Sequence, residues 1–231
     1  MARRPGGELA SRPLHFFWIC DCSGSMQSDG KIQALNNAIR EAIPHMQRAA
    51  GENPHAHVLV RALRFADGAR WHVATPTPVF DLRWEDLTAQ GITDMGRAMV
   101  LLAEQLRIPP MTDRALPPVL VLISDGQPTD DFAQGLRTLM QVPWAQRAVR
   151  IAIAIGDDAD PVPLRAFIGN PEVPVLQANG AESLVNYIRW ASTAVLRAAS
   201  APVGSGPPAA PVMLPIPAPP TEATPPAGEV W

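Results

Sequence analysis

Runs of consecutive apolar residues alternate along this chain with stretches whose apolar residues recur every three or four positions. The first pattern predicts strands buried on both faces, and the second predicts amphipathic helices. Strands are expected at residues 14–20, 57–65, 119–123, 149–155 and 173–176, with shorter pieces at 71–75 and 79–80 that Pro76 and Pro78 interrupt. Helices are expected at residues 31–47, 94–106, 131–140, 164–168 and 181–197. Strands that alternate with helices indicate an α/β fold, in which helices cover both faces of a doubly wound, mostly parallel sheet.

The end of the chain has a different composition. Residues 201–231 hold ten of the 26 prolines, two acidic residues, no basic residue and one aromatic residue, Trp231. Such a segment cannot bury enough apolar surface to offset its chain entropy, so we predict a disordered or polyproline II tail. Its PxxP spacings, Pro208 to Pro211 and Pro217 to Pro220, have no flanking arginine. A plain tail or linker is therefore the simpler interpretation, and a ligand for another protein is the alternative.

These patterns divide the chain into an N-terminal extension (1–13), a folded domain (14–199) and a proline-rich tail (200–231). No apolar run reaches the ~20 residues that span a bilayer, and the N-terminal arginines are not followed by the apolar stretch of a secretory signal. The net charge of -3 shows no basic excess of the kind that nucleic-acid binding requires. Two cysteines are too few for a disulfide framework, so we expect a reducing, cytoplasmic environment.

Hydroxyl and carboxylate side chains gather at the ends of the predicted strands. The set consists of Asp21, Ser23, Ser25, Thr93 and Asp125. Ligands of a doubly wound sheet bind beyond the carboxyl ends of the strands, where the strand order reverses. Two aspartates that end adjacent central strands would meet there. Three hydroxyls and two carboxylates are hard oxygen ligands, which suit Mg2+ better than zinc.

The charge of this set favours an interaction site. Hydroxyls are neutral ligands, so at most two protein charges balance the cation. If an aspartate acts through water, the metal keeps an open position that an incoming carboxylate can fill. We therefore expect a site that binds an Asp or Glu of a partner protein through a shared metal.

Three separated segments carry a resemblance to a known family. They are the D-x-S-x-S motif at residues 21–25, Thr93 in GITDMG and Asp125 in ISDG. In this order they resemble the von Willebrand factor A domain, over roughly residues 14–197. The resemblance implies a Rossmann-like sheet with a metal-ion-dependent adhesion site, in which the three hydroxyls contact the metal and the two aspartates hold it directly or through water. Mg2+ is the expected metal, with Mn2+ or Ca2+ as alternatives, and Ile92 stands where many relatives have a second glycine.

Two further motifs narrow the resemblance. ALNNAI (34–39) and SDGQPTDD (124–131) are most similar to bacterial TerY-type proteins of tellurite-resistance gene clusters. This similarity implies a stress or tellurite-resistance system and an association with a protein kinase and a phosphatase of the PP2C type. A chelatase-linked or another bacterial von Willebrand domain would look similar.

A Mg2+-dependent phosphoester hydrolase is the alternative function, since strand-end aspartates with Mg2+ are compatible with it. A hydrolase also needs a base beside the metal and a cation that holds the phosphate. No histidine lies near the three motif segments, and Lys31 is the only lysine. We therefore expect a non-catalytic binding domain.

Other polar residues have simpler interpretations. Alone, the motif at 21–25 could be a helix N-cap with a tight glycine turn. Cys20 and Cys22 are expected to be small core residues rather than ligands of a soft metal. His55 and His57 are spaced like metal ligands, but two ligands do not form a site, and the start of a strand explains them better.

The remaining acidic residues follow predicted strands. Asp157, Asp158 and Asp160 are expected in a solvated turn, with a second cation site as the alternative. Asp130 and Asp131 are expected to cap the helix at 131–140, close enough to the metal site to shape its rim.

Overall fold

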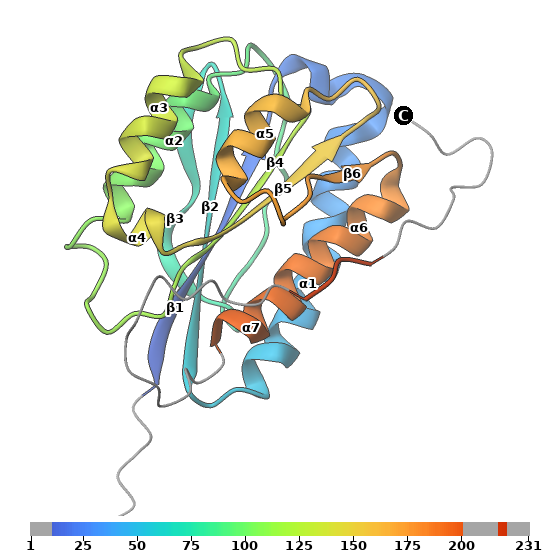
Figure 1. The fold of residues 1–231 in the computed structure, drawn as a ribbon. Helices are drawn as coiled ribbons and strands as arrows, with labels where there is room; N and C mark the ends of the chain where they lie inside the picture. The colour runs from blue at the N-terminus through green and yellow to red at the C-terminus, as the bar shows by residue number, and fades with distance from the viewer. Residues whose placement is uncertain (1–10, 201–216, 221–231) are drawn as a thin grey trace, which may run out of the picture.

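The computed structural model describes residues 11–200 and 217–220. Over these residues the chain forms one sheet with helices on both of its faces (Figure 1). The strands are β1 (Arg12–Asp21), β2 (Ala56–Ala66), β3 (Gly68–Pro78), β4 (Val119–Ser124), β5 (Val149–Ile155) and β6 (Leu176–Ala178). The α-helices are α1 (Lys31–Gly51), α2 (Met95–Gln105), α3 (Phe132–Met140), α4 (Pro143–Gln146), α5 (Pro161–Ile168), α6 (Ala181–Trp190) and α7 (Leu196–Ser200). A 3-10 helix, η1 (Gly24–Gly30), precedes α1, and a π-helical turn, η2 (Ala191–Val195), joins α6 to α7.

The strand order is β3-β2-β1-β4-β5-β6, and every neighbouring pair except β2 and β3 is parallel. The chain passes from β1 outward to β2 and β3, and then returns to β4 on the other side of β1. The strand order therefore reverses between β1 and β4, the position at which open α/β sheets bind ligands. The predicted fold class, a doubly wound and mostly parallel sheet flanked by helices, is confirmed.

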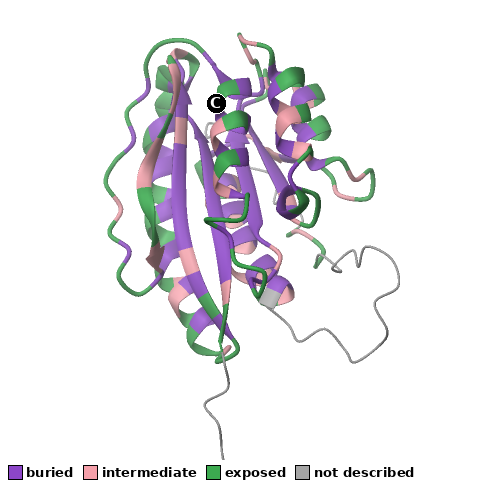
Figure 2. Cartoon of the chain, turned by 90° about the vertical axis from the view of Figure 1, so that its left-hand side faces the viewer, coloured by how far each residue is buried: buried purple, intermediate pink, exposed green. Residues whose placement is uncertain are grey.

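Alternate residues of β1 build two separate cores, because successive side chains of a strand point to opposite faces. Phe16 and Trp18 pack with α1, α6 and α7 on one face, whereas Phe17 and Ile19 pack with α2, α3 and α5 on the other. Figure 2 shows the central strands buried along most of their length. With both faces covered by helices, the ends of the strands are left for polar groups.

The strand piece predicted at 71–75 lies inside a longer strand, whereas the piece predicted at 79–80 is wrong. Residues 68–78 form one antiparallel edge strand, β3, and Val79 and Phe80 lie in the turn that follows. Proline cannot donate a ladder hydrogen bond, but an edge strand leaves one side of its backbone unpaired, so Pro76 is tolerated inside it.

The last strand is also displaced from its predicted position. Residues 173–176 were expected to form it, whereas β6 covers Leu176–Ala178. The helix predicted at 31–47 is longer, since α1 continues through Pro44 to Gly51. The helix predicted at 181–197 is present, but the π-helical turn η2 separates it into α6 and α7.

β1 begins at Arg12, inside the segment predicted as an N-terminal extension. Most of the predicted proline-rich tail, residues 201–216 and 221–231, lies outside the described residues, as do residues 1–10. The tail residues Pro217–Pro220 are described and adopt neither helix nor strand. Within the described ranges, no helix has the length and the apolar character needed to cross a membrane.

Two glycines bring α2 and α3 into close contact beside the candidate site. A Cβ atom added to Gly135 of α3 would lie 2.3 Å from the carbonyl oxygen of Gly96 in α2. A Cβ added to Gly96 would in turn lie 2.6 Å from the carbonyl oxygen of Asp131. The backbones of the two helices therefore touch, and neither glycine can carry a side chain without a shift.

We expect Gly135→Ala to destabilise the fold, even though alanine favours a helix over glycine by ~1 kcal/mol. The added methyl group must push α3 away from α2, at a cost of about 1–3 kcal/mol. Urea unfolding measures this as a lower midpoint with an unchanged slope.

Gln134→Ala, on the exposed side of α3, is the matched control and should stay within about 0.5 kcal/mol of the wild type. A Gly135→Ala variant more stable than the wild type would contradict the close contact of the helices.

Candidate metal centre

Asp21 is the last residue of β1, and its carboxylate is fully buried. One oxygen, Oδ1, accepts a hydrogen bond of 2.8 Å from the backbone N–H of Ser23. The other, Oδ2, accepts one of 2.5 Å from the hydroxyl of Ser124, at the end of the neighbouring strand β4. The Ser124 oxygen accepts from the N–H of Gly126 at 2.9 Å. Two adjacent strand ends therefore fix the orientation of Asp21.

The hydroxyls of Ser23 and Ser25 lie in the loop between β1 and α1, with their Oγ atoms 3.0 Å apart. Ser23 is buried and Ser25 is exposed, so the pair leads from the protein interior toward solvent. Ser23 is the N-cap residue of η1, but its side chain makes no capping hydrogen bond. The alternative interpretation of this motif as a side-chain N-cap is thus wrong.

Asp125 follows β4 and is 2% exposed. Among the described residues, its Oδ1 atom has no hydrogen-bond partner. Its carbonyl oxygen accepts a 2.8 Å hydrogen bond from the N–H of Asp160, which ties it to the loop after β5. A buried carboxylate oxygen without a partner is unfavourable unless a hydrogen-bond donor or a cation satisfies it. This atom is therefore suited to a metal ion.

Asp125 is close enough to Asp21 to affect its ionisation. Burial first, and then the negative charge of Asp125, raise the pKa of Asp21 to about 6, although hydrogen bonds from Ser124 and Ser23 act in the opposite direction. The only lysine, Lys31, pairs with Asp158 on the loop after β5, at 3.3 Å. The charge of the aspartate pair thus favours a cation between or beside the carboxylates.

Thr93 joins the site through its backbone. Its N–H donates to the Thr129 hydroxyl at 3.0 Å, and its carbonyl oxygen accepts from the N–H of Thr129 at 2.9 Å. Two residues earlier, the carbonyl oxygen of Gly91 accepts from the N–H of Gly24 at 2.9 Å. The loop that holds Thr93 is therefore bonded to both aspartate loops, and the Thr93 side chain is buried there.

Ile92 stands where many relatives have a second glycine, and its backbone φ is not in the positive region that favours glycine. Its N–H donates to the Asp67 carboxylate at 3.0 Å, and its side chain is 51% exposed. The preceding residue, Gly91, has a φ of +79°, and a Cβ atom there would lie 2.3 Å from Asp67. One glycine at this turn is required, and the second is not.

The structure thus brings Asp21, Ser23, Ser25 and Asp125 together and ties the Thr93 loop to them. Two positioning residues were not predicted from the sequence: Ser124, which bonds Asp21, and Thr129, which bonds Thr93. Ser124 immediately precedes Asp125 at the end of a fully buried strand, which is the signal that could have identified it.

One of the two predicted caps is wrong. Asp131 accepts from the N–H of Gln134 and caps α3, as expected. Asp130 instead accepts from the N–H groups of Gly96 and Arg97, at 2.8 and 2.9 Å, and caps α2. The cause is the close packing of α2 and α3, which brings the loop before α3 across the first turn of α2.

The cysteines, the histidine pair and the acidic loop after β5 agree with the simpler interpretation given for each. Cys20 and Cys22 are buried in the core on the α1 face, and His55 and His57 are exposed at the start of β2. Asp160 caps α5 through the N–H of Val162, at 2.9 Å. In the described part of the chain, no group of three or more His, Cys, Asp or Glu side chains is arranged to hold a metal.

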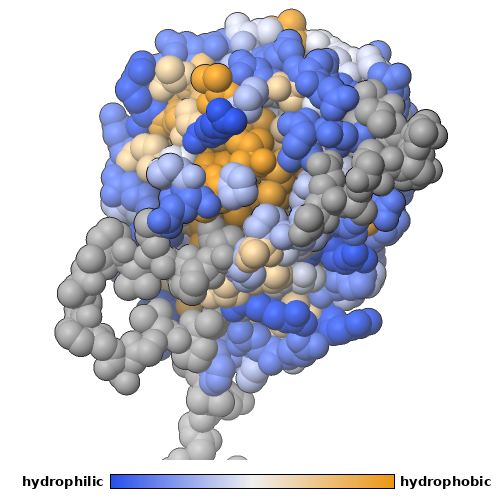
Figure 3. Space-filling view, turned by 45° about the vertical axis from the view of Figure 1, so that its right-hand side comes forward, coloured by the Kyte–Doolittle hydropathy of each residue, from blue (hydrophilic) through white to orange (hydrophobic). Residues whose placement is uncertain are grey.

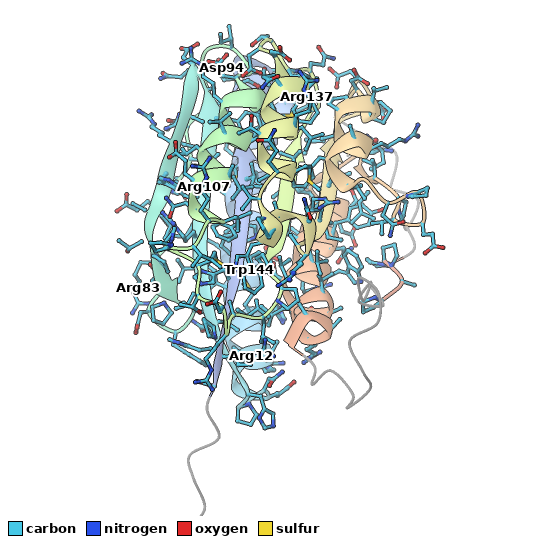
Figure 4. The ribbon with its side chains drawn as sticks, turned by 60° about the vertical axis from the view of Figure 1, so that its left-hand side comes forward. Arg12, Arg83, Asp94, Arg107, Arg137 and Trp144 are labelled. Carbon is cyan, nitrogen blue, oxygen red and sulfur yellow. The ribbon has the colours of Figure 1, made fainter. Side chains whose placement is uncertain are left out.

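The candidate site lies at one end of the sheet. Figure 4 shows Asp94, the N-cap residue of α2, at this end, and Arg12, at the start of β1, at the opposite end. Beside the site, α3, α5 and the loops before them line a hollow of about 1020 Å³. Figure 3 shows apolar side chains gathered in the upper half of the face that carries α5, with polar side chains around them.

No protein-family model matches the sequence, and no curated protein matches it. Solved structures match the fold. A von Willebrand factor type A protein from Catenulispora acidiphila superposes with a TM-score of 0.60 and 19% identity, over 80% of this chain and 42% of that one. The ArnB paralog VWA2 from Sulfolobus acidocaldarius gives 0.55 and 18%, over 78% and 45%. Proximal thread matrix protein 1 from the mussel byssus, with a zinc-occupied MIDAS motif, gives 0.59 and 16%, over 80% and 46%.

These similarities establish the fold: the chain has the architecture of a von Willebrand factor A domain. It spans less than half of the length of each of these three structures.

The raised pKa of Asp21 predicts a pH dependence of the metal-free protein. Between its usual value near pH ~4 and about pH 6, the folded state binds more protons at Asp21 than the unfolded state, so this group lowers the free energy of unfolding as the pH rises. Asp21→Asn removes the ionisation. In EDTA, the stability of this variant relative to wild type should grow by ~3 kcal/mol between pH 4 and pH 7, as measured by urea unfolding.

Asp157→Asn, at an exposed carboxylate on the loop after β5, is the matched control and should differ from wild type by a constant amount. If the difference between Asp21→Asn and wild type is equally flat with pH, Asp21 titrates normally and the burial argument is wrong.

Proposed function

We propose that this chain is a Mg2+-dependent protein-interaction module that binds an acidic residue of a partner through a shared metal. The metal would be held by five residues: Asp21, Ser23, Ser25, Thr93 and Asp125. The observation that supports this most directly is the buried Oδ1 atom of Asp125, which has no hydrogen-bond partner in the described residues and lies beside a second buried carboxylate.

The donor set supports a hard divalent cation. Carboxylate and hydroxyl oxygens are the ligands that Mg2+ prefers, and Mn2+ or Ca2+ accept the same type of ligand. The mussel protein with this fold has zinc in its MIDAS motif, which supports a divalent metal at this position. We propose Mg2+ because the set contains neither sulfur nor imidazole.

The partner would supply an Asp or Glu. The two protein carboxylates at most neutralise a divalent cation, and the hydroxyls add no charge, so an anionic ligand can still gain from coordinating the metal. Ser25 is exposed at the solvent side of the serine pair, which leaves an approach for that ligand. We propose a cytoplasmic TerY-like stress or tellurite-resistance system as the setting, with the associated kinase and PP2C-type phosphatase as candidate partners.

We propose that the domain is not an enzyme. Hydrolysis at the metal needs a general base within hydrogen-bond reach of the attacking water. All five histidines are in the described part of the chain, and none of them lies in the loops that hold the aspartates. His15, in the first half of β1, is buried and its pKa is lowered to about 4 by burial and by Arg61, far from this end of the sheet.

Metal binding is the first prediction of this proposal. Mg2+ at about 100 times its dissociation constant should stabilise the fold by ~2.7 kcal/mol and raise the unfolding temperature by about 5–10 °C. Asp125→Ala should remove this shift, because it removes the unpaired oxygen. Differential scanning calorimetry with Mg2+ and with EDTA measures the shift.

Asp157→Ala is the control variant, since it removes an exposed carboxylate from a neighbouring loop and should keep the full shift.

For partner binding, affinity capture from native lysate should recover a protein with wild type in Mg2+, but not in EDTA and not with Asp21→Ala. Recovery of the same proteins in all three cases would overturn the metal-dependent function.

A further inference from the structure

A short piece of the proline-rich tail lies against the helical face opposite α2 and α3. Figure 1 shows Pro217–Pro220 as a separate red segment beside α6 and α1. Ala218 and Pro220 line a hollow of about 480 Å³ together with side chains of the two helices and of η2 and α7. We call this the α1–α6 surface, and the side chains that define it are His45, Arg48, Arg189, Trp190, Thr193 and Arg197.

The α1–α6 surface combines aromatic and cationic groups. Trp190 is half-buried, and its indole nitrogen is buried without a hydrogen-bond partner among the described residues. Three arginines surround it, and two of them are held in place: Arg189 donates to Asn186 at 2.7 Å, and Arg197 pairs with Glu52 at 2.6 Å. The surface is thus partly preformed.

Pro217–Pro220 has the chemistry that suits this surface. Three of its four residues are prolines, which restrict φ and favour the extended polyproline II conformation. Grooves that bind such segments are lined by aromatic rings, and Trp190 supplies one here. A segment whose conformation is already restricted also loses little entropy when it binds. Within the segment Pro219 is half-buried, whereas Pro217, Ala218 and Pro220 are exposed. Ala218 and Pro220 line the hollow, and Pro219 between them is the least exposed residue of the segment.

The charges of the tail and of the α1–α6 surface also favour binding of the tail to this surface. Residues 201–231 contain two acidic residues and no basic residue, whereas the α1–α6 surface contains three arginines. Opposite charges favour docking of the tail, and tethering to the same chain raises its effective concentration at the surface.

We propose that the α1–α6 surface is a binding site for polyproline-type segments, and that Pro217–Pro220 of the same chain occupies it. The tail is then a ligand of its own domain rather than a plain linker. The site is separate from the metal centre: α1 begins at Lys31, next to the metal-site loop, and Arg48 lies ~25 Å further along the helix. Occupation of one site leaves the other open.

Cross-linking in the full chain tests this placement. In the Ala218→Cys, Thr193→Cys variant, one cysteine lies in the tail segment and the other on the α1–α6 surface. A short bis-maleimide reagent should link them within one chain, whereas Cys20 and Cys22 are fully buried and should not compete. The matched control pairs Ala218→Cys with Ala133→Cys, an exposed position on α3. We expect the first pair to react ~10-fold faster, because docking raises the local concentration of the tail cysteine.

Charge reversal at the surface, Arg48→Glu with Arg189→Glu, should bring the rate of the first pair down to that of the control, with an unchanged circular dichroism spectrum. Equal rates for the two pairs in the otherwise wild-type chain would overturn the proposal. Cross-links between two chains, seen as a covalent dimer, would overturn it as well, because the occupant would then be a second copy.

Discussion

Two carboxylates buried side by side at the ends of neighbouring strands impose the main constraint on this structure. Asp21 ends β1 and Asp125 follows β4, and both side chains are buried away from water. The fold places them there because the strand order reverses between these two strands. Ser124 and the backbone of Ser23 satisfy Asp21, whereas one oxygen of Asp125 is left without a partner in the described residues. This imbalance is typical of a site that a cation completes.

The loops around this pair are bonded to one another rather than only to their own strands. The β1 loop is tied to the Thr93 loop through Gly24, the Thr93 loop to the β4 loop through Thr129, and the β4 loop to the β5 loop through Asp160. Each link uses backbone groups, so side chains remain available for the metal. The serine and threonine hydroxyls are thereby presented on a series of connected loops, which is a more rigid arrangement than separate loops would give.

Much of the fold and part of the site could be predicted from the sequence, for reasons that particular residues show. Central strands such as β4 appear as uninterrupted apolar runs, and the D-x-S-x-S motif follows the first of them directly. β3 was predicted too short because an edge strand accepts Pro76, which pattern rules take as a break. Ser124 and the α2 cap made by Asp130 depend on which elements become neighbours in space. The docking of Pro217–Pro220 depends on a surface built from helices far away in the chain.

The cap that Asp130 makes on α2 has a consequence for ligands of another class. Rossmann-like sheets usually hold the phosphates of nucleotides at the amino terminus of a helix, where free N–H groups and the helix dipole favour an anion. Here the carboxylate of Asp130 already accepts from the N–H groups of Gly96 and Arg97. A phosphate at this helix would have to displace an internal anion and would meet its repulsion. The amino terminus of α2 is therefore occupied by a carboxylate of the chain itself and is closed to a phosphate or another anion.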